Sequence, residues 1–334
     1  MLTLVIIGIA IALVFDFLNG MNDAANSIAT IVASRVLSPF LAVLWAAFWN
    51  FAAFFLFTHA VAKAVGTGIV DISYTDVYMI LSALISAVIW VYFCTMKGLP
   101  ISVSHALIGG LVGAALFVHG SEALVWSGIL KIALFIVLSP IIGLVLGFLL
   151  MCLMMWLFKR SHPIKTDKLF HGLQLLSSAV FSLGHGSNDA QKTMGIITML
   201  LVSGKFLEQP DIPTWVSLTC YTTIALGTLI GGRKVIKTLG DGLSNIKPFQ
   251  GFCAETSGAL TLIGTAFAGI PVSTTHTITG SIIGVGVTKG FASVRWGTAV
   301  NIVAAWLITI PATLVISGAI YWGINWVIRM FVTV

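Results

Sequence analysis

The sequence predicts an all-α membrane protein built as an inverted-topology repeat of two homologous halves, with about 10–12 transmembrane segments that include broken helices or re-entrant hairpins. Three observations predict this fold class. Of the 334 residues, 58% are apolar and only 8% are charged, whereas soluble domains carry about 25% charged residues. Apolar stretches long enough to cross a bilayer recur along the chain. Two short polar motifs occur once in each half, where the chain should lie inside the membrane.

The apolar stretches set the order of the predicted elements. The first lies at the N-terminus without a preceding basic segment, so we expect it to span the membrane rather than to be a cleaved signal peptide. A hydrophilic, basic segment separates the halves. We therefore expect a first repeat at 1–158, a cytoplasmic linker at 159–168 and a second repeat at 169–334. The stretches, each long enough to cross the hydrocarbon as a helix, are 2–15, 39–58, 77–96, 125–158, 212–232, 251–270 and 296–332.

The distribution of charge predicts that the halves are inverted. Basic residues in short loops favour the cytoplasmic side. With the linker inside, the basic segment 233–247 also lies inside, while Glu208 and Asp211 lie outside. The first half obeys the same rule only when it is threaded the opposite way, with Arg35 and Lys97 inside. About five crossings per half then put both termini on the extracytoplasmic side of the cell (inner) membrane.

The first duplicated motif, here called the aspartate motif, places a carboxylate at bilayer depth in each half. It reads Gly-x-Asn-Asp at residues 20–23 and again at 186–189. Each ionised carboxylate there costs on the order of 3 kcal/mol, which argues against an accidental pair. Because glycine tolerates a helix break that frees carbonyl ligands, the motif favours a monovalent cation site over simple polar contacts between helices. Asn26 corresponds to Lys192, which could pair with a carboxylate or attract an anion.

The second duplicated motif, here called the hydroxyl motif, predicts two helix starts rich in donors. It reads Pro-x-Ser-x-Ser-His at 100–105 and Pro-x-Ser-Thr-Thr-His at 271–276. The first turn of such a helix presents unpaired N–H groups, and the added hydroxyls would form a neutral cradle for a tetrahedral oxyanion. The alternative is that each hydroxyl bonds back to its own helix. For His105 and His276 we favour a structural role over proton exchange or anion binding.

The remaining polar residues carry weaker signals. Glu255 lies in an apolar stretch without an acidic counterpart in the first half, which suggests an accessory ion or proton role. The four cysteines lie in apolar surroundings with no metal-ligand spacing, so they indicate buried thiols. No nucleotide-binding loop, nucleophile elbow or zinc-protease motif occurs. We therefore expect neither an enzyme nor a cofactor, and we attribute the net charge of +6 to membrane orientation rather than to nucleic-acid binding.

The two motifs, repeated once per half, resemble those of the inorganic phosphate transporter (PiT) family. The resemblance runs through nearly the whole chain. It implies uptake of inorganic phosphate with a coupling cation, sodium or a proton, through an inverted repeat that commonly forms a homodimer. The chain departs from animal members at Ile80, where they tend to carry a second glutamate, and in its short linker. Glu255 fits an acidic position of many members.

The resemblance and the motifs together define two sets of expected site residues. The expected phosphate-binding residues are Ser102, Val103, Ser104, Gln191, Thr193, Ser273, Thr274 and Thr275. The expected sodium ligands are Asn22, Asp23, Asn26, Asn188, Asp189 and Glu255.

The leading functional hypothesis is a secondary active transporter that imports phosphate by symport with a cation, with sodium as the first choice, through alternating access. The alternatives are a proton-coupled permease for phosphate, metal–phosphate or sulfate, and an anion channel. Sulfate has no proton to donate, so an acceptor carboxylate beside the anion favours hydrogen phosphate. A channel predicts uptake that ignores a sodium gradient, and a membrane phosphatase would release phosphate from an ester.

Overall fold

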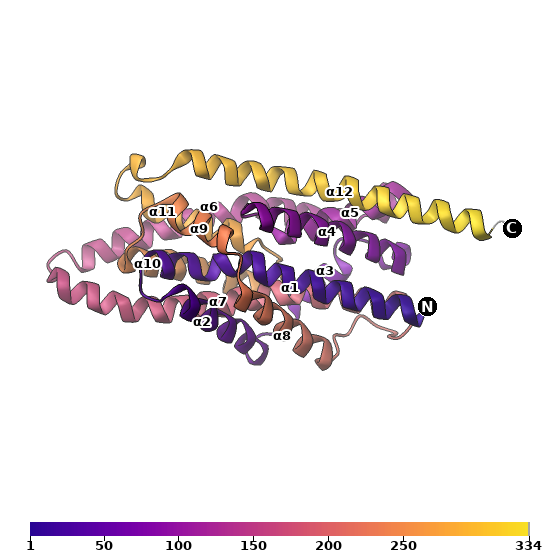
Figure 1. Ribbon diagram of the computed structural model, residues 1–334, viewed down its shortest axis with the longest axis horizontal. Helices are drawn as coiled ribbons and strands as arrows, with labels where there is room; N and C mark the ends of the chain where they lie inside the picture. Colours follow the sequence, from indigo (N-terminus) through magenta and orange to yellow (C-terminus); the bar gives the residue numbers. More distant parts are fainter. Residues whose placement is uncertain (333–334) are drawn as a thin grey trace.

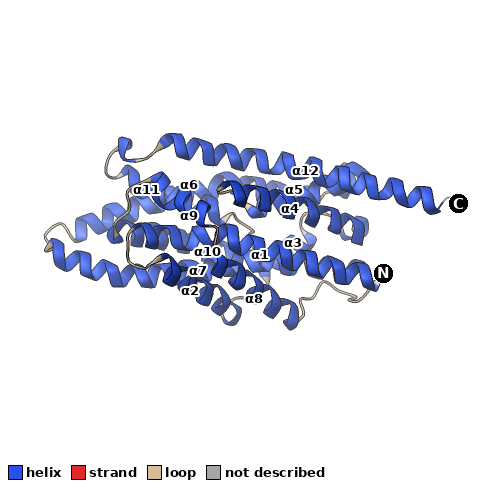
Figure 2. Cartoon of the chain, viewed as in Figure 1, coloured by secondary structure: helices blue, strands red, loops and turns tan. Residues whose placement is uncertain are grey.

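The computed structural model describes residues 1–332, which form an elongated bundle of helices (Figures 1 and 2). Four short 3-10 helices join the α-helices: η1 (Ala53–Phe55), η2 (Ile72–Tyr74), η3 (Ser121–Ala123) and η4 (Phe291–Ser293). The α-helices are α1 (Leu2–Ala33), α2 (Pro39–Ala52), α3 (Ala60–Thr67), α4 (Val77–Lys97), α5 (Val103–His119), α6 (Trp126–Leu157), α7 (Pro163–Ser203), α8 (Thr214–Ile230), α9 (Arg233–Leu243), α10 (Pro248–Phe267), α11 (Thr274–Val287) and α12 (Trp296–Val332).

Several helices have the length and composition of membrane spans. α1, α4, α6 and α12 are each long and apolar enough to cross a bilayer. Two further spans are broken: the segment of α2 and η1 bends by 84° into α3, and α8 bends by 79° into α9. The chain is therefore an all-helical membrane protein with apolar spans and broken helices, as the sequence predicts.

The second half repeats the element order of the first. The aspartate motif lies within α1 and within α7, and the hydroxyl motif begins α5 and α11. A 3-10 helix precedes the last helix of each half, η3 before α6 and η4 before α12. The duplication of short motifs thus extends to whole elements.

The first helices of the two halves run in opposite directions. Asp16 in α1 accepts a hydrogen bond from Thr193 near the end of α7, at 2.8 Å. Ser34, just after α1, donates to Gln174 near the start of α7, also at 2.8 Å. Since the contacts advance along α1 as they go back along α7, these helices are antiparallel neighbours at the centre of the bundle (Figure 1).

In each half, the helix that begins with the hydroxyl motif packs against the last helix of the other half. α5 lies along α12, and α11 lies along α6. Glycines make these contacts close: a Cβ added at Gly284 in α11 would overlap the carbonyl oxygen of Leu144 in α6, and one at Gly113 in α5 would overlap that of Leu314 in α12. Small residues allow such approach between membrane helices, where dispersion contacts replace the hydrophobic effect.

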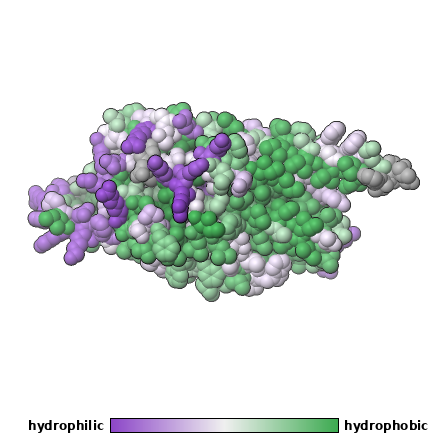
Figure 3. Space-filling model, viewed as in Figure 1, coloured by the Kyte–Doolittle hydropathy of each residue, from purple (hydrophilic) through white to green (hydrophobic). Residues whose placement is uncertain are grey.

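The two ends of the bundle differ in character. The start of α1 and the end of α12 lie at one end, and the connection between α6 and α7 lies at the other (Figure 1). Hydrophilic side chains gather at the connection end, whereas the middle of the visible face is apolar (Figure 3). Exposed basic residues there include Lys159, Arg160 and Lys165. The connection between α6 and α7 is shorter than the predicted linker at 159–168, because residues 163–168 already form the first turns of α7.

Candidate functional site

The starts of α5 and α11 meet inside the bundle. Each is capped by the first serine of its hydroxyl motif: the Oγ of Ser102 accepts from the backbone N–H of His105, and the Oγ of Ser273 from that of His276, both at 3.3 Å. Such capping satisfies one of the free N–H groups of the first turn. The rings of His105 and His276 pack edge to face with centroids 4.6 Å apart. The two first turns, each with its positive dipole end, therefore converge on one region.

The aspartate motifs lie in the middle of unbroken helices. We expected the glycines to break the helix, but α1 is continuous through Gly20 and α7 through Gly186. The glycines serve close packing instead. A Cβ at Gly20 would overlap the carbonyl oxygen of Ile224 in α8, and one at Gly186 would meet the backbone of Asn50 in α2 at 2.5–3.0 Å. These contacts fix α1 and α7 where the broken spans α2–α3 and α8–α9 pass them.

The motifs converge on one buried group of side chains, which we call the central cluster. It consists of Asp23, Asn26, Ser104, Asp189, Lys192, Thr274 and Thr275. Its two carboxylates share Thr274, whose Oγ1 lies 3.3 Å from an oxygen of Asp23 and 3.3 Å from one of Asp189. The amide of Asn26 donates to the hydroxyls of Thr274 at 3.2 Å and Thr275 at 2.9 Å. No member is more than 8% exposed, so the cluster is closed to both sides of the bundle.

Among the described residues, Lys192 is the one basic residue whose side chain contacts both Asp189 and the hydroxyl motifs. Its Nζ donates to Oδ1 of Asp189 at 2.5 Å, to Oγ of Ser104 at 2.5 Å and to the carbonyl oxygen of Val272 at 2.9 Å. The sequence left open whether this lysine pairs with a carboxylate or faces an anion. The structure shows the carboxylate pair, held beside the hydroxyls of both motifs.

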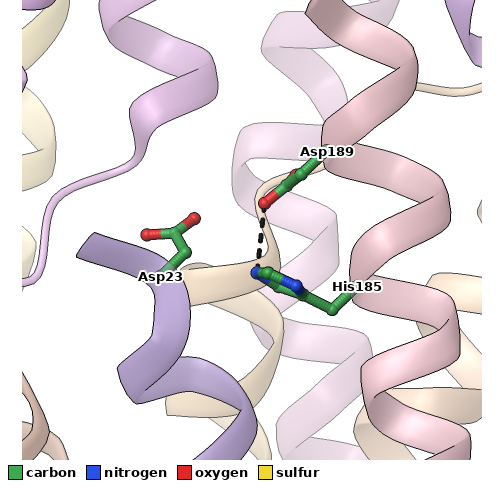
Figure 4. Close-up of side chains that lie close together, drawn as sticks. All are labelled: Asp23, His185 and Asp189. Carbon is green, nitrogen blue, oxygen red and sulfur yellow. Dashed lines mark ion pairs between the residues drawn. The ribbon is translucent and has the colours of Figure 1, made fainter. Parts of the chain in front are cut away.

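A histidine lies beside the two aspartates. Nε2 of His185 lies 3.3 Å from Oδ2 of Asp189 (Figure 4). The other ring nitrogen of His185, Nδ1, lies 3.1 Å from the side-chain oxygen of Asn50. One ligand atom each from Asp23, His185 and Asp189 lie within 4.8 Å of one another (Figure 4). Carboxylate oxygens, a hydroxyl and an imidazole at this spacing can hold a small cation.

Other predicted site residues lie near the cluster but have different partners. Asn22 donates to Thr95 of α4 at 2.8 Å, and Asn188 donates to the carbonyl of Leu262 in α10 at 2.9 Å. Both amide oxygens are buried without a hydrogen-bond partner. The two asparagines thus tie their helices to α4 and α10, in matching fashion.

Gln191 and Thr193 point away from the hydroxyls with which they were grouped. The Oε1 of Gln191 accepts from the backbone N–H groups of Val61 at 2.9 Å and Ala62 at 3.3 Å, at the start of α3. The hydroxyl of Thr193 is bound to Asp16. Val103 is a buried apolar residue in the first turn of α5, where Thr274 stands in α11.

Glu255 belongs to a separate polar group between α1, α7 and α10. Its carboxylate accepts from Thr30 at 2.6 Å, Gln174 at 3.0 Å and Ser177 at 2.5 Å. Thr30 lies one turn beyond Asn26 on α1, so the Glu255 group is next to the central cluster along that helix.

The site contains groups that sequence reasoning missed. His185 and Asn50 were not expected there, nor were the carbonyls of Ile101 and Val272. His185 lies four residues before Asp189, and this helical spacing was the available signal. Asn50 carries no such signal, because its contact with His185 spans 135 positions.

Comparison with known proteins matches residues 19–317 to the phosphate transporter family. A probable low-affinity inorganic phosphate transporter of Rhizobium meliloti is 54% identical over 94% of this chain and 95% of its own length. One from Bacillus subtilis is 43% identical over 97% of this chain and 98% of its own length. A solved structure described as the sodium-dependent phosphate transporter superposes with a TM-score of 0.91 at 26% identity, and covers 97% of this chain and 99% of that one.

Proposed function

Since this chain belongs to the phosphate transporter family, we propose that it imports inorganic phosphate by symport with sodium. The observation that carries this proposal is the central cluster, where two carboxylates, three hydroxyls and one ammonium group meet between two converging helix starts. An oxyanion needs donors and positive dipole ends, and a cation needs carboxylate and carbonyl oxygens. The cluster offers both within contact distance of each other.

We assign phosphate to the space between the first turns of α5 and α11. Ser104, Thr274 and Thr275 would donate hydroxyl hydrogen bonds there, and the backbone N–H groups that follow Ser102 and Ser273 would add theirs, including that of Val103. Lys192 would face the same anion as its nearest positive charge. Gln191 and Thr193 would act indirectly, because they hold α3 and Asp16 against α7.

We assign sodium to the oxygens around Asp23 and Asp189. Asn26 would complete the shell or hold it in place through Thr275, and Asn22 and Asn188 would support it from the positions that precede the two aspartates in the sequence. A cation there would balance the carboxylates and attract the phosphate, so each ion would favour binding of the other. Glu255 would form an accessory position one turn away.

We further propose that the halves form an inverted repeat and move by alternating access. Two observations support this. α1 and α7 are antiparallel, and α5 and α11 each pack against the last helix of the other half. The basic connection end would then face the cytoplasm, and both termini would lie outside. Assembly as a homodimer is part of this proposal.

The test is uptake of radiolabelled phosphate into liposomes with sodium and proton gradients imposed separately. We expect an inward sodium gradient to drive accumulation and a proton gradient alone to fail. Asp189→Asn removes the partner of a buried ammonium and should lower the rate by about tenfold or more. Asp211→Asn, at an exposed loop position, is the matched control and should leave uptake unchanged. Accumulation driven by protons alone would point to a proton-coupled permease, and none under either gradient would rule out symport.

A further inference from the structure

The two halves place the same kinds of oxygen around two corresponding positions. Each position has an aspartate carboxylate, a hydroxyl from the hydroxyl motif of one half and a backbone carbonyl from that of the other. Corresponding members lie 166 positions apart for the carboxylates and 171 apart for the others. The first oxygen set is Asp23, Thr275 and the carbonyl of Ile101, and the second oxygen set is Asp189, Ser104 and the carbonyl of Val272.

The second oxygen set is already occupied by a cation of the chain itself. Nζ of Lys192 lies 2.5 Å from the carboxylate, 2.5 Å from the hydroxyl and 2.9 Å from the carbonyl. An ammonium group has three donors, and these three oxygens receive all of them. Lys192 is 3% exposed, so the charge is held inside the bundle rather than in water.

The first oxygen set has no such cation. Its corresponding residue is Asn26, whose amide is neutral and donates to Thr275 at 2.9 Å. Thr275 in turn donates to the carbonyl of Ile101 at 3.0 Å and lies 3.5 Å from Asp23. Asp23 is 3% exposed, and the described residues place no basic side chain within 4.0 Å of its carboxylate. A buried carboxylate in this situation either binds a proton or stays ionised with a cation beside it, so the first oxygen set is the one that is open to a cation from outside the protein.

We propose that Lys192 is a tethered cation that permanently fills one of two equivalent cation positions, so that only the first oxygen set exchanges sodium. The inference rests on the proposed sodium symport and concerns how many ions it couples. This protein would then transport one sodium ion fewer per phosphate than a transporter in which both oxygen sets bind sodium. A tenfold sodium gradient at zero membrane potential supports about tenfold less phosphate accumulation for each coupled sodium that is lost.

The test exchanges the corresponding residues of the two halves. Lys192→Asn opens the second oxygen set, and Asn26→Lys fills the first. Radioactive sodium bound per chain is counted on purified protein at saturating sodium, and phosphate accumulation is measured in voltage-clamped liposomes. We expect Lys192→Asn to bind one sodium more than the unaltered protein and to accumulate about tenfold more phosphate under a tenfold gradient. Asn26→Lys should bind one sodium fewer.

The outcomes separate this inference from the proposed function. Equal sodium counts in the unaltered protein and Lys192→Asn would overturn the tethered cation while sodium-driven uptake stands. If Lys192→Asn fails to fold, Asn26→Lys decides, because an unchanged count in that variant overturns the inference alone. An unaltered protein that binds no sodium and shows no sodium-driven uptake would overturn the symport itself. Lys205→Asn is the matched control, since Lys205 is exposed in a left-handed turn (φ 62°) that asparagine tolerates.

Discussion

His105 and His276 pack against each other at the point where the two hydroxyl motifs meet, with ring centroids 4.6 Å apart. His276 also stacks on Trp306 of α12 at 3.6 Å and lies 3.2 Å from the carbonyl oxygen of Ile136 in α6 through its Nδ1. The two histidines hold corresponding positions, so the contact joins corresponding first turns. Through these contacts the two rings pack the first turns of α5 and α11 against each other and against α6 and α12.

His276→Ala should loosen this junction. The variant loses ring packing and a buried hydrogen bond, together worth about 2 kcal/mol of unfolding free energy. We expect lower thermal stability in detergent and a higher KM for phosphate, because the hydroxyls of α11 lose their support. His276→Phe keeps the ring and should recover most of both. Recovery in His276→Phe would show that ring packing is what His276 contributes. If His276→Phe were fully stable but inactive, transport would require the imidazole itself, for example for proton transfer.

Glu255→Gln tests the accessory ion position. The carboxylate accepts three hydrogen bonds, and glutamine would place its NH₂ group against donors and lose one or more of them. If sodium passes this position, the sodium concentration for half-maximal uptake should rise by about tenfold while KM for phosphate at saturating sodium stays the same. Glu122→Gln, at an exposed position in η3, provides the comparison. An unaltered sodium dependence would assign Glu255 to helix packing alone.

Gly284→Ala should separate α11 from α6. The added methyl group would meet the backbone of Leu144, which cannot rotate away as a side chain could. Overpacking of this kind costs about 1–3 kcal/mol, so the thermal midpoint should fall. Gly264→Ala in α10 is the control, because an added Cβ there has no neighbour within 4 Å and alanine favours the helix. Equal midpoints for the two variants would show that the α6–α11 contact adapts without cost.

The inverted arrangement predicts which loops face which side. In a background without the four native cysteines, Ser161→Cys between α6 and α7 and Ala292→Cys in η4 should react only with reagents that enter the cytoplasm. Ser121→Cys in η3 should react from outside. η3 and η4 correspond in the two halves, so their labelling from the same side would contradict the inversion.

The sequence predicted the spans better than it predicted the central helices. Length and apolar composition suffice for α6 or α12, because most of the residues in their apolar stretches lie outside the protein interior. α7 escaped this pattern over residues 163–203: other helices cover it, and it carries polar residues such as Gln174 and Lys192 in its interior contacts. The aspartate motifs correctly predicted polar residues inside α1 and α7. The predicted helix break at their glycines was wrong, because both helices are continuous.

The site could be predicted by residue type more readily than by contact. Duplication singled out Asp23, Asp189 and the hydroxyl motifs, and the structure brings these together. It did not reveal that Lys192 reaches Ser104 and Val272, since those partners lie 88 and 80 positions away. Gln191 and Thr193 were predicted, with the hydroxyls, to bind phosphate. Helical geometry turns them toward α3 and Asp16 instead.

The pairing of α5 with α12 also bears on how the chain matures. α5 leaves the ribosome with Gly109 and Gly113 uncovered, and its partner α12 is synthesised only after every other helix that the structure describes. Until then the first hydroxyl motif lacks Trp306, whose indole N–H binds the carbonyl of Pro100 at 3.1 Å. Chains truncated before residue 296 would therefore reach the bilayer with an unfinished interior, and neither half expressed alone should yield a folded unit.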